Sequence, residues 1–282
     1  MNYRHAYHAG NLADIFKHLT LAHLLVQLRD KDTPFCVIDT HAGAGSYDLR
    51  GTEALKTCEA QSGAFAFAKL EPDAALAPLQ EVLAKWNLGI SFGKDFQEKQ
   101  LRFYPGSPAI IQHYARANDR LLAVEKHPEE NKKLRKMLSP YFNAQIHQRD
   151  AWEAMGALIP PPEKRALVFI DPPYEQPDEM EKAFTAISKA YERMAHAVFA
   201  LWYPVVDDIA VASLKEKFAS SGIPKILCLE AEFSPRKTLR GCGLILINPP
   251  WKMGEKLSEA LNLLQPLFAE SSAPAELSWL KP

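Results

Sequence analysis

The sequence lacks several features that mark specialised classes of protein. Its 282 residues include only four cysteines, and their spacing matches neither a CxxC pair nor a metal-binding set. No apolar run approaches the length of a membrane span, and the N-terminal segment has no hydrophobic stretch typical of a secretory signal. These absences predict a cytoplasmic protein with reduced cysteines.

Net charge is also nearly absent. The chain carries 33 Lys and Arg against 34 Asp and Glu, which gives a formal charge of −1 at pH 7. A protein without an overall positive field attracts nucleic acid only through local basic patches. Any contact with nucleic acid is therefore expected to have a limited footprint.

Two common nucleotide-binding motifs are missing as well. The small-residue loop "DTHAGAGSYD" contains Gly43 and Gly45, but Asp48 stands where a dinucleotide-binding GxGxxG motif has its third glycine. No Walker lysine follows the loop. NAD and FAD are disfavoured, and a nucleoside cofactor without a pyrophosphate fits better, although a plain tight turn has the same local pattern.

What the sequence does contain is a regular alternation of apolar runs and helical patterns. This alternation predicts one α/β domain over residues 1–282, with a mostly parallel sheet covered on both faces. A helix is predicted over 12–29, with Asn11 as its N-cap and Asp14 in capping-box position. The Ala-rich region 53–100 is predicted to be a helical insertion between the first two strands. Strands are predicted at 35–39, 121–125, 144–148, 166–170, 197–204, 225–230 and 243–250.

Acidic residues follow the first three predicted strands. They are Asp39, Glu125 and Asp150. Ligands of doubly wound sheets bind beyond the carboxyl ends of the strands, where Glu125 could accept both hydroxyls of a ribose and Asp150 an adenine amino group. Each acid alone is typical of a solvated strand end or a helix cap, but three in succession favour a nucleoside site.

The fourth predicted strand ends in Asp171-Pro172-Pro173-Tyr174. An aromatic amine such as adenine N6 is a poor nucleophile, because its lone pair is delocalised into the ring. The Asp171 carboxylate and the Pro172 carbonyl could accept its two protons and release that lone pair for attack on a methyl group. Tyr174 could stack on the target base. The alternative is a strand that ends at prolines beside a solvated aspartate.

These motifs, together with "YRHAYHAGNLADIFKH", "YPGSP" and "LWYPV", resemble the bacterial ribosomal RNA large-subunit methyltransferase J (RlmJ) family over the whole chain. The resemblance implies a class I, Rossmann-like methyltransferase fold with a seven-stranded sheet and a helical insertion. It implies S-adenosylmethionine as cofactor and N6-methylation of one adenine, at position 2030, in 23S rRNA. In this fold the last strand is antiparallel, so the similar "INPPW" at residues 247–251 is assigned a structural role.

The resemblance also implies roles for individual residues. It makes Asp171 the proton acceptor and catalytic centre. With Pro172 and Tyr174, whose roles are argued above from the residues, Asp171 forms the predicted catalytic set, and Tyr174 is also predicted to bind substrate. Tyr3 and His5, in the predicted N-terminal lid over residues 1–11, are predicted to bind substrate together with Lys17. Two competing interpretations remain: this segment is a frayed terminus, and its histidines are ordinary surface residues. Ala151 stands where the family often has glycine. The cofactor-binding residues are His18, His41, Ser107, Glu125, Asp150, Ala151 and Asp171.

Basic residues in the loop 234–241 are the predicted phosphate contacts, namely Arg236, Lys237 and Arg240. The "KKLRK" run at 132–136 reads most simply as a solvated helix face. We expect a monomer without metal that acts on naked 23S rRNA or a hairpin rather than on the mature ribosome. Two alternatives remain open: a DNA adenine-N6 methyltransferase, and a noncatalytic RNA-binding protein on the same fold.

Overall fold

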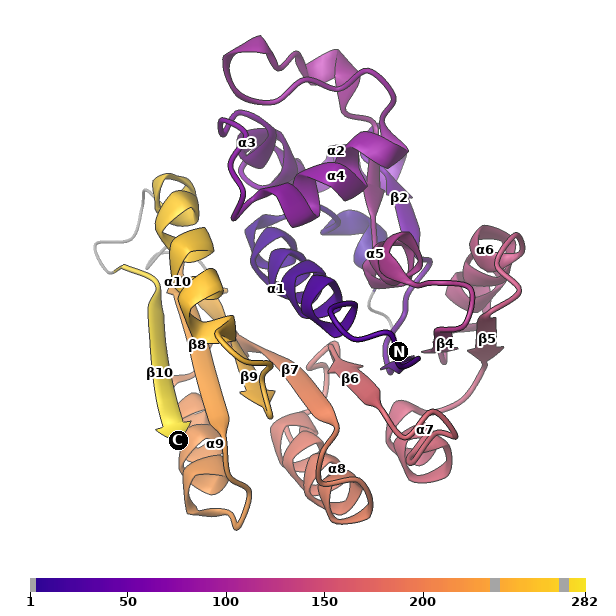
Figure 1. Cartoon of the computed structure of the whole chain (residues 1–282). Helices are drawn as coiled ribbons and strands as arrows, with labels where there is room; N and C mark the ends of the chain where they lie inside the picture. Colours follow the sequence, from indigo (N-terminus) through magenta and orange to yellow (C-terminus); the bar gives the residue numbers. More distant parts are fainter. Residues whose placement is uncertain (1–3, 234–238, 269–273) are drawn as a thin grey trace.

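An eight-stranded sheet forms the centre of the computed structural model, which describes residues 4–233, 239–268 and 274–282 (Figure 1). The strands occur in the order β10-β8-β9-β7-β6-β1-β4-β5. Strands β5, β4, β1, β6 and β7 are parallel, whereas β9 is antiparallel to both β7 and β8. The bounds are β1 Cys36–Asp39, β4 Arg120–Val124, β5 Ala144–His147, β6 Ala166–Ile170, β7 Val198–Val205, β8 Ile226–Glu232, β9 Gly241–Ile247 and β10 Glu276–Lys281.

The predicted fold class is confirmed, with one strand more than expected. All seven predicted strands are present, and the last of them, β9, is antiparallel as predicted. The eighth strand, β10, pairs with β8 at the edge of the sheet. Its residues are exposed or only partly buried, so β10 has no continuous apolar run by which it could be recognised.

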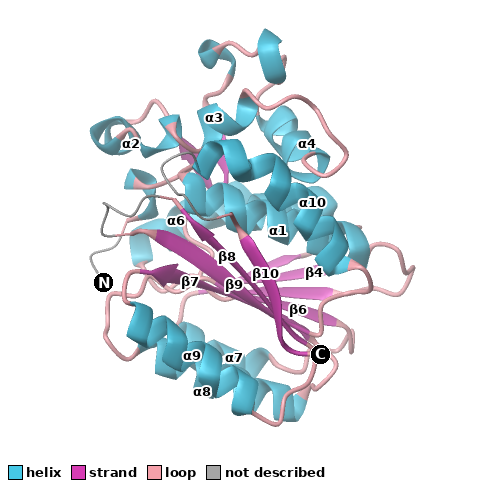
Figure 2. Ribbon diagram, turned by 90° about the vertical axis from the view of Figure 1, so that its left-hand side faces the viewer, coloured by secondary structure: helices cyan, strands magenta, loops and turns pink. Residues whose placement is uncertain are grey.

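Helices cover both faces of the sheet (Figure 2). Alternate strand residues face opposite layers, so Val37 packs with one set of helices while Ile38 packs with the other. The first set is α1 (Leu12–Leu28), α5 (Ser107–Tyr114), α6 (Pro128–Leu138) and α10 (Met253–Leu264), and the second is α7 (Ala151–Leu158), α8 (Glu179–Arg193) and α9 (Asp208–Ser220). Among the described residues, no helix combines the length and apolar character that crossing a membrane requires.

The helix α1 is buried on all sides, which its sequence pattern did not predict. A second group of short elements covers the side that faces away from the sheet (Figure 1). This group contains β2 (Ser46–Asp48), α2 (Thr52–Thr57), α3 (Ala64–Ala68), α4 (Ala77–Trp86) and β3 (Phe103–Pro105), with 3-10 turns at Glu59–Gln61, Gly93–Asp95 and Glu98–Gln100. Two further 3-10 turns, His5–Tyr7 and Gln265–Phe268, precede α1 and follow α10. Strands β2 and β3 form a separate two-stranded antiparallel sheet. Polar residues of α1 are therefore held inside the protein.

The helical group contacts the start of α1 at two glycines. The Ala64 N–H donates to the Gly10 carbonyl at 2.7 Å. A Cβ added to Gly63 would lie only 2.0 Å from the same Gly10 oxygen. This close backbone contact fixes where α1 begins.

Replacement of Gly63 by alanine is expected to lower the free energy of unfolding by about 2 kcal/mol, because overpacking a backbone contact costs about 1–3 kcal/mol. Urea denaturation measures the change. The matched control is Gly156→Ala in α7, where an added Cβ meets no atom within 4 Å. That control should be neutral or slightly stabilising, and equal losses in the two variants would contradict the proposed contact.

Candidate active site

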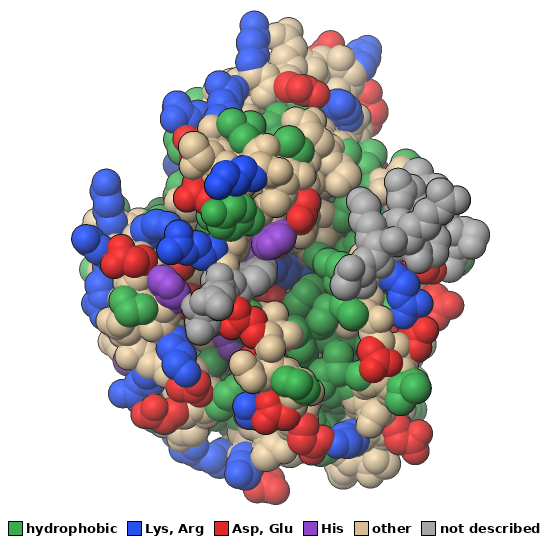
Figure 3. Space-filling view, turned by 180° about the vertical axis from the view of Figure 1, so that it is seen from behind, with side chains coloured by type: hydrophobic (Ala, Val, Ile, Leu, Met, Phe, Trp, Pro, Cys, Tyr) green, Lys and Arg blue, Asp and Glu red, His purple; other side chains and the backbone are tan. Residues whose placement is uncertain are grey.

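A cavity of about 840 Å³ lies at the carboxyl ends of the parallel strands, large enough for a nucleoside-sized ligand. The space-filling view shows the hollowed face (Figure 3). Residues 40–43 after β1, 124–127 at the end of β4, 149–152 after β5 and 171–176 after β6 form its walls. The N-terminal segment, α1 and residues 57–62 of the helical group cover it from the other side.

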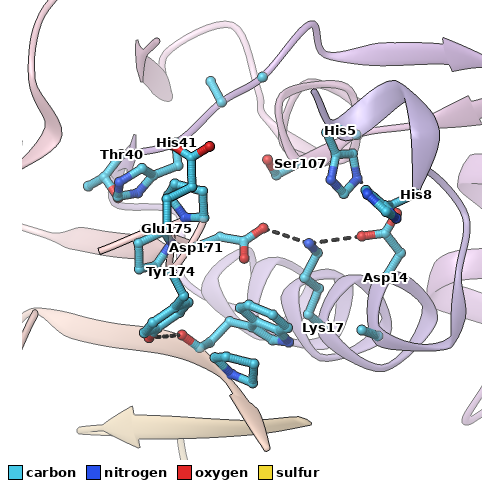
Figure 4. A pocket seen from close by; sticks show the side chains of 18 of the residues that line it. His5, His8, Asp14, Lys17, Thr40, His41, Ser107, Asp171, Tyr174 and Glu175 are labelled. Atoms are coloured by element: carbon cyan, nitrogen blue, oxygen red, sulfur yellow. Dashed lines mark hydrogen bonds and ion pairs between the residues drawn. The ribbon is translucent and has the colours of Figure 1, made fainter. Parts of the chain in front are cut away.

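At the centre of the cavity, one buried lysine joins two carboxylates (Figure 4). The Lys17 ammonium lies 2.6 Å from Asp171 Oδ2 and 2.8 Å from Asp14 Oδ1. Its nitrogen also lies 5.3 Å from the centre of the Trp202 ring. Lys17 is only 4% exposed. A buried ammonium is costly without counter-charges, and here two carboxylates supply them.

Asp14 is held by several donors at once. Its Oδ2 accepts the Gly10 N–H at 2.7 Å and lies 3.0 Å from His5 Nε2. Burial alone would raise the pKa of Asp14, but the charges of His5 and Lys17 outweigh it and hold that pKa well below its usual range. Asp14 is therefore an ionised, fully buried anchor for the lysine.

Two histidines in the cavity wall are held neutral. Burial lowers the pKa of His18 to about 3 and that of His41 to about 4. His18 Nδ1 lies 2.9 Å from the Tyr104 hydroxyl, and the His41 ring stands edge-on to Trp152. Neither ring adds positive charge to the cavity at neutral pH.

The acids after the first three parallel strands meet in one region, as the order of the strands predicted. Glu125 accepts the backbone N–H groups of Gly43 and His127, at 2.9 and 2.6 Å. Asp150 caps α7 through the N–H of Trp152 and pairs with Lys126 at 3.0 Å. Asp39 is fully buried at the end of β1, and burial raises its pKa to about 7. Ser107 and Ala151, the first residues of α5 and α7, also line the cavity.

The chain turns sharply after Asp171. Tyr174 has a φ of 52°, in the left-handed region that residues with a side chain rarely adopt. Its hydroxyl donates to the Trp202 carbonyl at 2.7 Å, and its ring lies edge-on to the Trp202 ring. This contact holds the tyrosine against the end of β7 (Figure 4).

One predicted site residue, Arg240, lies away from this cavity, and three others are outside the described residues. Arg240 pairs with Asp208 at 2.6 Å and lines a second cavity beside α9, so the structure gives no support to its predicted role as a phosphate contact beside the first cavity. Tyr3, Arg236 and Lys237 lie outside the described residues. Asn248 donates to the carbonyl oxygens of Ala195 and Ala197, where β7 begins, which agrees with its structural assignment.

Sequence reasoning missed Asp14 as a site residue, and it missed Glu59 and Trp202. The Asn11 side chain does accept the Asp14 N–H, so the cap is present, but the Asp14 carboxylate turns into the cavity. The Glu59 carboxylate accepts a hydrogen bond from the Asn11 side-chain amide and lies 2.8 Å from His8 Nδ1. The one available signal for Asp14 was its place one helical turn before Lys17.

Comparisons with known proteins agree with one another. The family model described as "Ribosomal RNA large subunit methyltransferase D, RlmJ" matches residues 32–281. Two proteins called ribosomal RNA large subunit methyltransferase J are similar over 100% of this chain and 99% of their own: that of Escherichia coli K12 is 35% identical, and that of Haemophilus influenzae is 34% identical. The crystal structure of protein LPL1258 from Legionella pneumophila matches with a TM-score of 0.84 at 33% identity, covering 96% of this chain and 98% of that one.

The Asp14→Asn variant is expected to lose about 3 kcal/mol of unfolding free energy at pH 7, because it removes one partner of a buried ion pair. The folded-state pKa of Asp14 is depressed, so its stabilising contribution is complete above about pH 4 and is lost as the pH falls through the folded-state pKa. Urea denaturation should therefore give a difference from wild type that is about 1 kcal/mol smaller at pH 3.

The control for this variant is Asp178→Asn, which removes an exposed partner of Lys182 and should change little at either pH. A loss for Asp14→Asn that is the same at pH 7 and pH 3 would contradict the depressed pKa.

Proposed function

The chain belongs to the family described as ribosomal RNA large subunit methyltransferase D, RlmJ, and we propose that it transfers a methyl group from S-adenosylmethionine to N6 of one adenine in 23S rRNA. The membership confirms the family resemblance of the motifs. The observation that carries the proposal is the place of Asp171: it stands at the end of β6, inside the cavity, beside Tyr174 and the buried Lys17.

The cavity suits a cationic nucleoside cofactor. S-adenosylmethionine, when bound, supplies a methyl group on a positively charged sulphur. Carboxylates of Asp39, Glu125 and Asp150 gather at this end of the sheet, and burial keeps the imidazoles of His18 and His41 neutral. Negative groups beside uncharged imidazoles favour a cation electrostatically.

The cofactor would be held by residues from four strand ends. We assign the ribose hydroxyls to Glu125 and the adenine amino group to Asp150, because carboxylate oxygens accept from both kinds of donor. His18, His41, Ser107 and Ala151 complete the wall around it.

Asp171 would act on the target amine. Lys17 donates to its Oδ2, which leaves Oδ1 to accept one N6 proton, while the Pro172 carbonyl accepts the other. Two fixed acceptors would draw the N6 lone pair out of the ring, so that it can attack the methyl carbon. The N–C bond would form as the bond from that carbon to sulphur breaks, which leaves S-adenosylhomocysteine, and the proton lost from N6 would pass to Asp171 Oδ1 and then to water. The ammonium of Lys17 orients the carboxylate that performs this task.

The target base would stack on Tyr174, which is held by Trp202. The predicted lid over residues 1–11 would cover that base, with His5 anchored on Asp14. The insertion over residues 53–100 would form the outer wall of the site through Thr57, Glu59 and Ser62. We propose a single-domain monomer that acts in the cytoplasm, without metal, on naked rRNA or a hairpin.

Transfer of labelled methyl from S-adenosylmethionine to deproteinised 23S rRNA tests the function. Label is expected as N6-methyladenine at one site, and Asp171→Asn should reduce the rate about a hundredfold or more because it removes a preorganised charged acceptor. The control is Trp251→Ala in the second proline motif, whose side chain is 84% exposed and should be dispensable. Label in duplex DNA but not in 23S rRNA would contradict the proposal, as would an Asp171→Asn variant with full activity.

Cofactor affinity is expected to depend on pH through Asp39. Its pKa of about 7 means that the carboxyl becomes charged as the pH rises through 7, which adds negative charge near a cationic ligand. Calorimetry should show tighter binding of S-adenosylmethionine at pH 7.5 than at pH 6. Asp39→Asn, a neutral isostere of the protonated acid, should fold normally and lose this difference; an unchanged difference would exclude Asp39 as its source.

A further inference from the structure

We propose that residues 126–149, which comprise α6, the edge strand β5 and the loops that flank them, form the surface that binds RNA phosphates next to the target adenine. The proposal rests on the proposed function and adds the path of the RNA over the enzyme. The helix α6 had been interpreted from sequence as an ordinary solvated face, and three structural observations change that interpretation.

The first observation is local charge. Residues 126–149 carry only two acids, Glu129 and Glu130, against six basic residues: Lys126, Lys132, Lys133, Arg135, Lys136 and Arg149. Lys133 pairs with Glu130, Lys126 with Asp150 and Arg149 with Glu153. Within the described part of the chain, Lys132 and Lys136 form no ion pair, and both are exposed. Like charges three or four residues apart repel one another on a helix, so an anionic partner would stabilise this face.

The second observation is the position of this surface. Lys126 and Arg149, at its two ends in sequence, line the cavity that contains Asp171. Glu130 of α6 lines the same cavity, and a Cβ added to Gly45, in the loop after β1, would lie 2.2 Å from the Met137 side chain of α6. Figure 3 shows blue side chains gathered on the side of the hollow where α6 lies. The basic surface is therefore continuous with the rim of the site.

The third observation is that the opposite rim is acidic. Of the four acids in residues 175–181, Asp178 pairs with Lys182 and Glu181 with Lys217, whereas Glu175 and Glu179 line the cavity. Asp207 and Asp208 stand at the start of α9, where Asp208 already pairs with Arg240. Phosphates would be repelled from that side and attracted to α6.

The dimensions suit a strand that leaves the cavity. The 11 residues of α6 span roughly 16 Å. One strand of a nucleic-acid helix advances about 3.4 Å per nucleotide, so the surface could follow about five nucleotides. Phosphate contacts at this distance from the adenine would position the RNA without reading its sequence.

The experiment compares two triple variants with the same change in net charge. One carries Lys132→Gln, Lys133→Gln and Lys136→Gln on α6. The control carries Lys182→Gln, Lys189→Gln and Lys217→Gln on α8 and α9, beneath the other face of the sheet. For each full-length protein, the Kd for a 23S rRNA transcript is measured at several salt concentrations, together with S-adenosylmethionine affinity and kcat at saturating RNA.

The α6 variant is expected to bind RNA about tenfold or more weakly near physiological salt, and its slope of log K against log salt should fall by about two to three. Its cofactor affinity and kcat should equal those of wild type, and the control should bind RNA within about twofold of wild type. Wild-type RNA affinity in the α6 variant, or equal losses in both variants, would overturn the proposed surface. If wild type binds cofactor but methylates no RNA, the proposed function fails, and the surface proposal fails with it.

Discussion

The site depends on one buried lysine between two carboxylates. Lys17 comes from α1 and Asp171 from the end of β6, 154 residues later in the chain, and their ion pair joins the N-terminal helix to the centre of the sheet. Burying an ammonium is unfavourable unless its counter-charges are fixed. Asp14 is fixed by the Gly10 N–H and by His5, and the helical group fixes Gly10 in turn. The catalytic motif is therefore oriented by contacts that extend to the outer layer of the protein.

The same burial sets the charge of the cavity. Enclosing α1 between the sheet and the helical group removes His18 from water and lowers its pKa to about 3, so this residue contributes shape and hydrogen bonding without charge. Asp39 is buried too, and its pKa rises to about 7. Positive charge at the centre of the site comes from Lys17, which the two carboxylates balance. A cationic cofactor is favoured in such an environment, and an anionic dinucleotide is not.

The sequence allowed the parallel strands, their ends and the motif at Asp171 to be predicted, because these features are local: an apolar run ends where prolines and acids begin. It did not allow the environment of α1 to be predicted, since its apolar spacing is the same whether one face or all faces are buried. Asp14 was predicted only as the capping-box residue of α1, because its place three residues after Asn11 is visible in the sequence. The direction in which its carboxylate points, towards Lys17 and into the cavity, depends on the fold. Arg240 was predicted as a phosphate contact from its basic loop, and its ion pair with Asp208 joins segments too far apart in the sequence to be predicted. The strand β10 has half of its side chains exposed to solvent, so its sequence contains no apolar run from which a strand could be predicted.

The most direct test of the central claim, that Asp171 acts on the target amine, is a crystal structure of the protein with a nonreactive cofactor analogue and an RNA that contains the target adenine. The account predicts that Asp171 Oδ1 and the Pro172 carbonyl each lie about 3 Å from N6, with Lys17 still on Oδ2 and the base stacked on Tyr174. An adenine bound with N6 beyond hydrogen-bonding distance of Asp171, or docked at Asn248 instead, would contradict it.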